Sequence, residues 1–462
     1  MFPESYVGQI FFAEHGSFLP VFLSESRRHT SPWHGAGERR PSDLQWIQRC
    51  PMEPRETDLI YDWNVQAKSL SGPPQPIELN DETLRDGLQS PSVISPPIEK
   101  KLEILHLMND LGIHSADIGL PGAGPHVQEQ VLRLAREIAE EKLSIAPNCA
   151  ARTLKADIDP VIDISQKSGI AIECATFIGS SAIRQYAEDW DLDRLLRHTR
   201  EAVGYVVKNG LPNMYVTEDT TRARPETLRQ LYTAAIEHGA RRICLCDTVG
   251  HATPAGVRNL VGFIKGVVAE TGERVKIDWH GHRDRGLDIP NTLAAIDAGV
   301  DRVHGCALGI GERCGNTSMD LLLVNLKLMG WIDHDLTRLP DYFRTVSEAV
   351  GVPIPPGYPV FGSDAFRTGT GVHAAAVIKA FRKKDVWLAD RVYSGVPAGE
   401  FGLKQRIEIG PMCGLSNVHF WLTSRGLPLK EELVQAIFRT AKESTRVLDD
   451  AEVEALVHRY LD

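Results

Sequence analysis

From residue 77 onward, short apolar segments rich in β-branched residues recur about every thirty residues, the length of a strand–helix unit. Helix-like stretches with periodic apolar positions lie between them. Eight strands alternating with helices over about 250 residues are typical of a (β/α)8 TIM barrel, an α/β fold. The predicted strands are Ile77–Asn80, Ser115–Leu120, Leu143–Asn148, Ala171–Ile178, Asn213–Glu218, Arg242–Asp247, Val275–His280 and Arg302–Leu308.

The intervening helices carry start and stop signals. Pro225 opens one predicted helix, and Gly239 follows its last apolar position. A doubly wound open sheet is the alternative arrangement, but it needs a glycine-rich crevice motif after the first strand. No Gly-x-Gly-x-x-Gly sequence follows Asn80, and the glycines of residues 309–315 follow the last strand at a different spacing. The sequence therefore favours the barrel.

We expect three regions along the chain. Residues 1–52 lack sustained periodicity, which predicts a poorly ordered N-terminal extension. Residues 53–335 contain the barrel. Residues 336–462 are interpreted as a linker and a small α/β C-terminal subdomain, with terminal helices near 431–444 and 451–460.

Composition argues against several kinds of partner. The net charge is −10 and the basic residues are scattered, which makes nucleic acid an unsuitable partner. No apolar run approaches the roughly 20 residues that a membrane-spanning helix needs. None of the eight cysteines belongs to a Cys-x-x-Cys pair. Their positions in apolar runs indicate reduced thiols in a cytoplasmic protein.

Polar side chains gather where several predicted strands end, which is the catalytic face of a TIM barrel. His280 and His282 lie two residues apart on one strand, so their imidazoles point in the same direction. A divalent metal site requires such convergence. A polar strand end facing solvent or a partner is the alternative interpretation of this histidine pair.

Three strand-end motifs occur in order along the chain: Leu84-Arg85-Asp86-Gly87-x-Gln89, His280-x-His282 and Gly309-Ile310-Gly311-Glu312-Arg313-x-Gly315-Asn316. Together they resemble the acyl-transferring metalloenzymes of the isopropylmalate synthase and homocitrate synthase family. That family also includes citramalate synthases and Re-type citrate synthases, and it is related to hydroxymethylglutaryl-CoA lyase. The similarity covers roughly residues 76–415, which comprise the predicted barrel and part of the C-terminal subdomain.

The resemblance implies a metal site and a substrate site. Asp86, His280 and His282 would bind a divalent ion (Mg, Mn or Zn), with Asn316 either a weaker ligand or a residue that supports the ligands from behind. The ion would polarise the keto group of a chelated 2-oxo acid. Arg85 would stabilise the growing alkoxide charge, although a structural ion pair is the alternative for this residue. The residues that would bind the oxo acid are Gln89, Thr248 and Arg152.

The resemblance also implies a base and a second subunit. Glu218, His373 and Tyr393 would remove a proton from the methyl group of acetyl-CoA, which would then attack the keto carbon in a Claisen-type condensation with thioester hydrolysis. His373 and Tyr393 would come from the C-terminal subdomain of the neighbouring chain, so a homodimer with exchanged subdomains is expected. The alternatives are a surface histidine and an ordinary packed aromatic.

The chain departs from the family pattern at positions that bear on the substrate. Arg283 stands where asparagine is usual, Asp117 replaces a common glutamate, and Ala175 or Glu173 stands where many isopropylmalate synthases carry histidine. The Gly309–Asn316 signature nevertheless makes 2-isopropylmalate synthase, an enzyme of leucine biosynthesis, the first prediction. Homocitrate, citramalate and Re-citrate synthases are the alternatives. A carbon–carbon lyase and a catalytically silent barrel are rival classes.

Overall fold

The computed structural model describes residues 59–62 and 72–461. The chain divides into two units, residues 1–66 and 67–462. The second unit contains every predicted strand. The extension expected at residues 1–52 lies outside the described residues.

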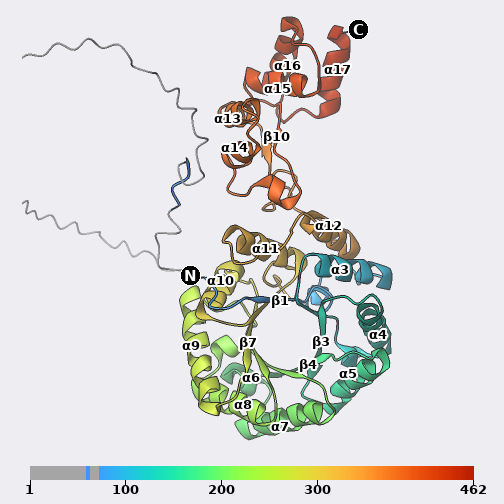
Figure 1. Cartoon of the computed structure of the whole chain (residues 1–462), viewed down its shortest axis with the longest axis vertical. Coiled ribbons are helices and arrows are strands. Elements are labelled where there is room, and N and C mark those ends of the chain that lie inside the picture. The colour runs from blue at the N-terminus through green and yellow to red at the C-terminus, as the bar shows by residue number, and fades with distance from the viewer. Residues whose placement is uncertain (1–58, 63–71, 462) are drawn as a thin grey trace, which may run out of the picture. The chain divides into compact units, whose positions relative to one another are not determined.

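Eight parallel strands form a closed barrel in sequential order, with β1 paired to β8 (Figure 1). The predicted TIM barrel is therefore confirmed. The strands are β1 (Glu78–Asp81), β2 (Ser115–Asp117), β3 (Ala146–Arg152), β4 (Glu173–Gly179), β5 (Asn213–Glu218), β6 (Arg242–Asp247), β7 (Lys276–Gly281) and β8 (Arg302–Gly305).

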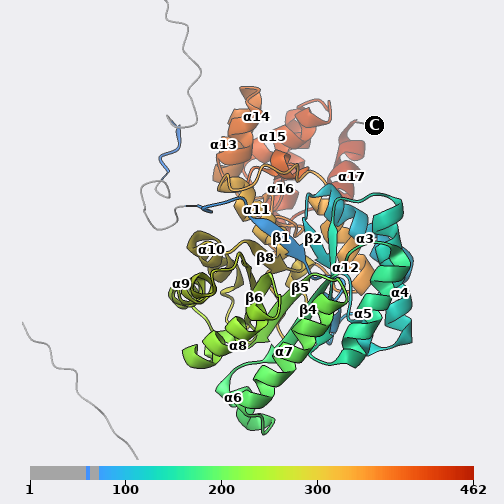
Figure 2. The same ribbon diagram turned by 60° about the horizontal axis from the view of Figure 1, so that its bottom comes forward.

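Helices surround the strands (Figure 2). In α9 the Thr253 side chain caps the first turn by accepting from the Gly256 N–H, and Pro254 occupies that turn. Gly272 ends the helix at φ +71, a conformation that suits glycine. The barrel helices are α3 (Ile98–Asp110), α4 (Pro125–Glu140), α5 (Lys155–Ser168), α6 (Ala182–Ala187), α7 (Leu192–Lys208), α8 (Pro225–Glu237), α9 (Pro254–Thr271), α10 (Asp288–Ala298) and α11 (Met319–Leu328).

The third strand begins three residues later than expected, at Ala146. The residues before it belong to the turn that ends α4, where Lys142 has φ +54 and the Leu143 N–H donates to the carbonyl of Ile138. These residues cannot pair with a neighbouring strand while they close the helix. At its other end the strand continues four residues beyond the predicted Asn148, so that Arg152 is its last residue.

The N-terminal part of the barrel interior is filled by ion pairs, where branched apolar side chains are common in this fold. Asp278 on β7 accepts hydrogen bonds from Arg302 Nε and Arg242 Nη1, both at 2.7 Å. Arg302 also donates to Glu173, and Arg242 to Glu78. Because Asp278 and Arg302 are buried, loss of one partner would leave an uncompensated charge at a cost of several kcal/mol.

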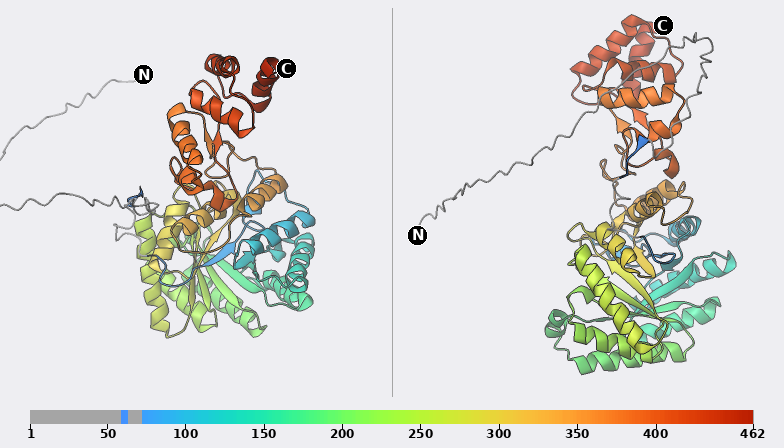
Figure 3. Two further views of the ribbon diagram at one scale, coloured as in Figure 1. Left: turned by 45° about the horizontal axis from the view of Figure 1, so that its top comes forward. Right: turned by 60° about the vertical axis from the view of Figure 1, so that its left-hand side comes forward.

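A small α/β subdomain follows the barrel (Figure 3). Its two short strands pair in parallel, and three terminal helices enclose a core that includes Trp421, Leu433 and Ile437. The described helices contain none that is long and apolar enough to cross a membrane. Helix α12 (Leu339–Val350) packs against α3 of the barrel and shares its core. The subdomain elements are β9 (Arg367–Thr368), α13 (Gly371–Arg382), α14 (Val386–Arg391), β10 (Arg406–Ile407), α15 (Leu415–Ser424), α16 (Glu431–Glu443) and α17 (Asp450–Leu461).

Candidate active site

A cavity of about 210 Å³ lies inside the barrel toward the C-terminal ends of the strands. Carboxylates, imidazoles and guanidinium groups form one part of its wall, and small or apolar side chains form the rest. Residues far apart in the chain are thus brought together, as the fold requires of a catalytic face. Seven of the residues proposed from the sequence line it: Arg85, Asp86, Gln89, Glu218, Thr248, His280 and His282.

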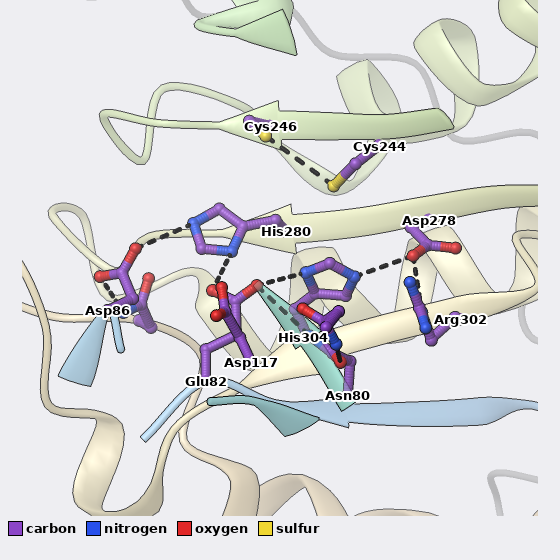
Figure 4. A network of polar contacts seen from close by, with 12 residues as sticks. Asn80, Glu82, Asp86, Asp117, Cys244, Cys246, Asp278, His280, Arg302 and His304 are labelled. Atoms are coloured by element: carbon purple, nitrogen blue, oxygen red, sulfur yellow. Dashed lines mark hydrogen bonds and ion pairs between the residues drawn. The ribbon is translucent and has the colours of Figure 1, made fainter. Parts of the chain in front are cut away.

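Asp86, His280 and His282 form a buried cluster in which one donor atom from each lies within 4.8 Å of the others. The Nε2 atoms of the two histidines are 3.2 Å apart, and His280 Nε2 is 3.9 Å from Asp86 Oδ2. Figure 4 shows Asp86 and His280 facing each other. One carboxylate and two imidazoles make a mixed oxygen and nitrogen donor set suited to Mg, Mn or Zn.

The hydrogen bonding of this cluster supports a bound cation. His282 Nδ1 and Asn316 Oδ1 are buried and lack a hydrogen-bond partner. Two ring nitrogens that face each other at 3.2 Å share at most one proton between them. Burial and the neighbouring His280 lower the pKa of His282 to about 4, whereas Glu82 outweighs burial and raises the pKa of His280 to about 9. Binding of a cation would therefore displace a proton from His280 Nε2. The residues present therefore fit a divalent ion.

The glycine-rich loop after β8 holds Asn316 against the cluster. Asn316 Nδ2 donates to Asp86 Oδ1 at 2.8 Å. Gly311 has φ +151, and a Cβ added to it would overlap the Asn316 amide. Gly315, at φ +105, packs against the carbonyl of Gly309 in the same way. The spacing of these glycines is thus a requirement of close backbone packing.

Arg283, the departure from the usual asparagine, binds this same loop. Its Nε donates to the carbonyl of Cys314 at 2.8 Å, and its Nη1 donates to the Ser318 hydroxyl at 3.2 Å. The guanidinium therefore supports the glycine-rich loop through hydrogen bonds that an asparagine would be too short to make.

Arg85 is surrounded by three carboxylates. Its Nε donates to Asp117 at 2.7 Å, and its two terminal nitrogens donate to Glu82 at 2.9 Å and to Asp86 at 3.0 Å. Burial opposes its charge, but these carboxylates hold the pKa of Arg85 well above its usual value. Arg85 therefore forms structural ion pairs and also presents its positive charge at the cavity wall. A structural role and a role in stabilising an alkoxide are thus compatible.

Glu218, the last residue of β5, and Thr248, which follows β6, also line the cavity. Burial raises the pKa of Glu218 above the usual value of a glutamate, and the positive charges of Arg184 and Arg85 partly offset this. The Thr248 hydroxyl accepts the Asp219 N–H at 2.8 Å. The direction of this shift is the one expected of a general base.

Arg152 is not brought to the cavity. It is the last residue of β3, and its guanidinium is bound by Asp157 in the first turn of α5, with Nε to Oδ2 at 2.6 Å. The Arg152 side chain is 60% exposed. This ion pair turns the side chain away from the interior, so the structure gives no support to a substrate contact by Arg152 within one chain.

His373 and Tyr393 also lie outside the barrel cavity. Their rings stack at 4.3 Å between centroids and line a separate cavity of about 190 Å³ in the C-terminal subdomain. Arg367, Thr370 and Gln405 contribute to the same wall. The two residues predicted to act together are therefore neighbours, while their delivery to another subunit's barrel stays a prediction.

Three further buried residues lie at the cavity wall: Glu82, His304 and Asp117. Of these, the sequence pattern had indicated Asp117 only as a departure from the family, and it had assigned no role to Glu82 or His304. Asp117 and His304 lie on strands at positions that alternate with outward-facing residues, so strand periodicity could have indicated both. Glu82 follows the end of β1 at Asp81, where alternation no longer fixes the direction of a side chain. The only indication in the sequence was that Glu82 lies two residues before the Leu84–Gln89 motif.

A TIM barrel with a buried carboxylate–imidazole site at its mouth defines a class of metal-dependent barrel enzymes. Residues 76–346 match the HMGL-like family model, which is more than half of the chain. The chain belongs to this HMGL-like family.

Curated relatives within the family are synthases by name. The chain is 33% identical over 395 residues to the homocitrate synthase AksA of Methanopyrus kandleri, covering 84% of this chain and 94% of that protein. It is 32% identical to a probable 2-isopropylmalate synthase of the same organism (80% and 70% covered) and 30% identical to its putative citramalate synthase (82% and 70% covered). Because the three identities are nearly equal, they do not indicate which of the three synthase activities this chain has.

Solved structures agree on the fold. The HMG-CoA lyase of Bacillus subtilis superimposes with a TM-score of 0.51 at 20% identity, covering 62% of this chain and 97% of the lyase. The HMG-CoA lyase of Brucella melitensis gives a TM-score of 0.50 at 16% identity, with 59% and 98% covered. At these identities the likeness concerns the barrel alone.

Proposed function

We propose that this chain is an acyltransferase that condenses acetyl-CoA with a 2-oxo acid and hydrolyses the thioester, and that its activity is that of a 2-isopropylmalate synthase. The observation that carries the proposal is the convergence of Asp86, His280 and His282 beside Arg85 and Glu218 in one cavity. A divalent ion held by the first three residues would supply Lewis-acid polarisation of the keto group.

The residues around that site have separable tasks in the proposed reaction. Glu218, with its raised pKa, would accept a proton from the acetyl methyl group. Arg85 would face the oxygen on which negative charge grows, which can contribute on the order of 3 kcal/mol. Thr248 and Gln89 would bind the oxo acid from the cavity wall. His373 and Tyr393 would enter from the subdomain of a second copy of the chain.

The apolar part of the wall supports an aliphatic substrate side chain. It comes from four neighbouring strands, β3 to β6, and contains no charged group among its described members. Burial raises the pKa of the Cys244 thiol well above its usual value, so this cysteine is a small apolar surface at neutral pH. The residues of this apolar wall are Ala150, Ala175, Phe177, Met214, Val216, Cys244 and Cys246.

The charges of the cavity argue against a second substrate carboxylate. Five carboxylates and two guanidinium groups line it among the described residues. Arg85 is already bound by three carboxylates, and Arg313 is paired to both oxygens of Asp284, at 2.8 and 3.0 Å. The distal carboxylate of 2-oxoglutarate or oxaloacetate would face the apolar wall without a partner, at a cost of several kcal/mol. Citramalate synthesis from pyruvate is the second candidate, because the same wall accepts a methyl group.

A thiol-release assay tests the proposal. The metal-loaded enzyme is incubated with acetyl-CoA and, in separate reactions, 3-methyl-2-oxobutanoate, pyruvate, 2-oxoglutarate or oxaloacetate. We expect coenzyme A release that depends on the oxo acid and is fastest with 3-methyl-2-oxobutanoate. Fastest release with a dicarboxylate would reject the assigned side-chain pocket. Cleavage of hydroxymethylglutaryl-CoA without any condensation would identify a lyase, and absence of both reactions would support a silent barrel.

A further inference from the structure

We propose that Glu82 is a positioning residue for the metal site: it binds the Nδ1 side of His280, so that Nε2 is directed at Asp86 and His282. This inference rests on the proposed function, because it assigns a task toward the proposed ion. Glu82 itself would not contact the ion or the substrate.

The Glu82 carboxylate is buried, and each of its two oxygens accepts hydrogen bonds from different side chains. Its Oε2 lies 3.0 Å from His280 Nδ1 and 2.9 Å from a terminal nitrogen of Arg85. Its Oε1 lies 2.7 Å from His304 Nδ1. An ionised carboxylate only accepts hydrogen bonds, so His280 must carry its proton on Nδ1. That tautomer leaves the Nε2 lone pair free for a metal.

A series of paired groups connects Glu82 to the ion pairs of the barrel interior (Figure 4). His304 on β8 places its second ring nitrogen 3.0 Å from Asp278 Oδ2. Asp278 is in turn held by Arg302 and Arg242, both at 2.7 Å. Donors and acceptors alternate along this path from the ion pairs of the barrel interior up to His280. The orientation of one metal-facing imidazole is thus tied to a rigid, buried network.

Glu82, His280 and His304 also have donor atoms close enough to one another to suggest an ion between them. The distances favour hydrogen bonds there: 2.7 and 3.0 Å are ordinary separations for N–H to carboxylate contacts, and both are satisfied. On the Asp86 side, by contrast, the Nε2 atoms of His280 and His282 face each other, and the buried Asn316 Oδ1 has no hydrogen-bond partner. The geometry therefore assigns the ion to Asp86, His280 and His282, and Glu82 to their support.

The test measures Mn²⁺ binding to the metal-free full-length protein, followed by the electron paramagnetic resonance signal of free Mn²⁺. The wild type should bind one ion per chain. Glu82→Gln keeps the shape of the side chain but loses the ionised acceptor, and we expect its Kd to rise roughly ten- to a hundred-fold with one site retained. Asp81→Asn is the matched control: the same change, one residue earlier, in a side chain bound to Thr83 and Tyr342, should leave the Kd within about twofold.

His304→Gln is the second variant and covers the case in which Glu82→Gln does not fold. It should weaken Mn²⁺ binding by less than Glu82→Gln, because Arg85 still holds the carboxylate. A Kd for either variant equal to that of the wild type would overturn its part in positioning. Loss of all binding in Glu82→Gln together with normal binding in Asp86→Asn would move the ion to the Glu82–His304 side and overturn the assignment. If the wild type binds Mn²⁺ through Asp86 but releases no thiol, the proposed function fails while the positioning role stands.

Discussion

The Nε2 atoms of His280 and His282 lie 3.2 Å apart in a buried site, and no hydrogen-bond partner meets the Nδ1 of His282. At this separation the two ring nitrogens can share one proton, or both of their lone pairs can bind a cation. The Asp86 carboxylate, close to both imidazoles, supplies the negative charge that would favour a divalent cation there.

The first prediction concerns this histidine pair. His282→Ala should weaken Mn²⁺ binding by at least about a hundredfold and abolish oxo-acid-dependent thiol release, because one of three protein ligands is lost. His106→Ala is the control, since that half-exposed imidazole pairs with Glu137 on the helical surface. Unchanged metal content in His282→Ala would remove the basis of the metal site.

The second prediction concerns the pH dependence of kcat. Glu218 acts as a base only when ionised, and burial raises its pKa, so activity should fall on the acid side at a pH above the usual 4.5 of a glutamate. Arg184 lowers the pKa of Glu218, so Arg184→Gln should move this acid limb to higher pH. Glu218→Gln should lower kcat roughly a hundred- to ten-thousand-fold while changing the KM for the oxo acid little. A pH profile identical in Arg184→Gln and the wild type would contradict the assignment.

The third prediction concerns stability. Asp81 is buried beneath Tyr342, whose hydroxyl donates to it, and burial raises its pKa to about 6. A carboxyl whose pKa is raised in the folded state stabilises the fold below its unfolded value, and this contribution is lost as the pH rises through about 6. Asp81→Asn stays neutral, so its free energy of unfolding relative to the wild type should increase between pH 4 and 7.5, by at most about 3 kcal/mol. Urea titrations at the two pH values measure this, and an unchanged difference would refute it.

Much of the fold and part of the site could be predicted because they depend on local periodicity. Alternation along β7 is sufficient to point His280 and His282 in one direction, and strand ends of a parallel barrel meet at one face. The same reasoning extends to His304, which lies two residues after Arg302 on β8. It was overlooked because a single histidine inside a strand has no motif around it.

Other positions depend on contacts that periodicity does not contain. Arg152 lies at the end of a strand, where a substrate-binding residue would lie. Its guanidinium instead donates to the carboxylate of Asp157, five residues later, and is held outside the cavity. His373 and Tyr393 stack on each other within the C-terminal subdomain, and their proposed site belongs to another chain. Local sequence therefore identifies which groups are chemically suitable, while tertiary and quaternary contacts decide which of them reach the cavity.

The fourth prediction tests the apolar wall. Ala175 on β4 faces the cavity, and Ala175→Leu would occupy the space proposed for the substrate's branched side chain. We expect kcat/KM for 3-methyl-2-oxobutanoate to fall roughly tenfold or more, while pyruvate, with its single methyl group, is affected less. Pyruvate thus serves as the internal control. An equal loss for both substrates would show that Ala175 does not determine side-chain selection.

The last prediction tests whether the site is shared between chains. Asp86→Ala should inactivate the barrel part of a site, and His373→Ala should inactivate the subdomain part. In a dimer with exchanged subdomains, co-expression of the two variants yields mixed dimers in which one site has an intact barrel and an intact subdomain, so about a quarter of wild-type activity should return. If each chain instead completes its own site, every site in the mixture carries one defect and no activity returns. Recovery therefore depends on which chain supplies His373, because folding and metal binding alone cannot produce it.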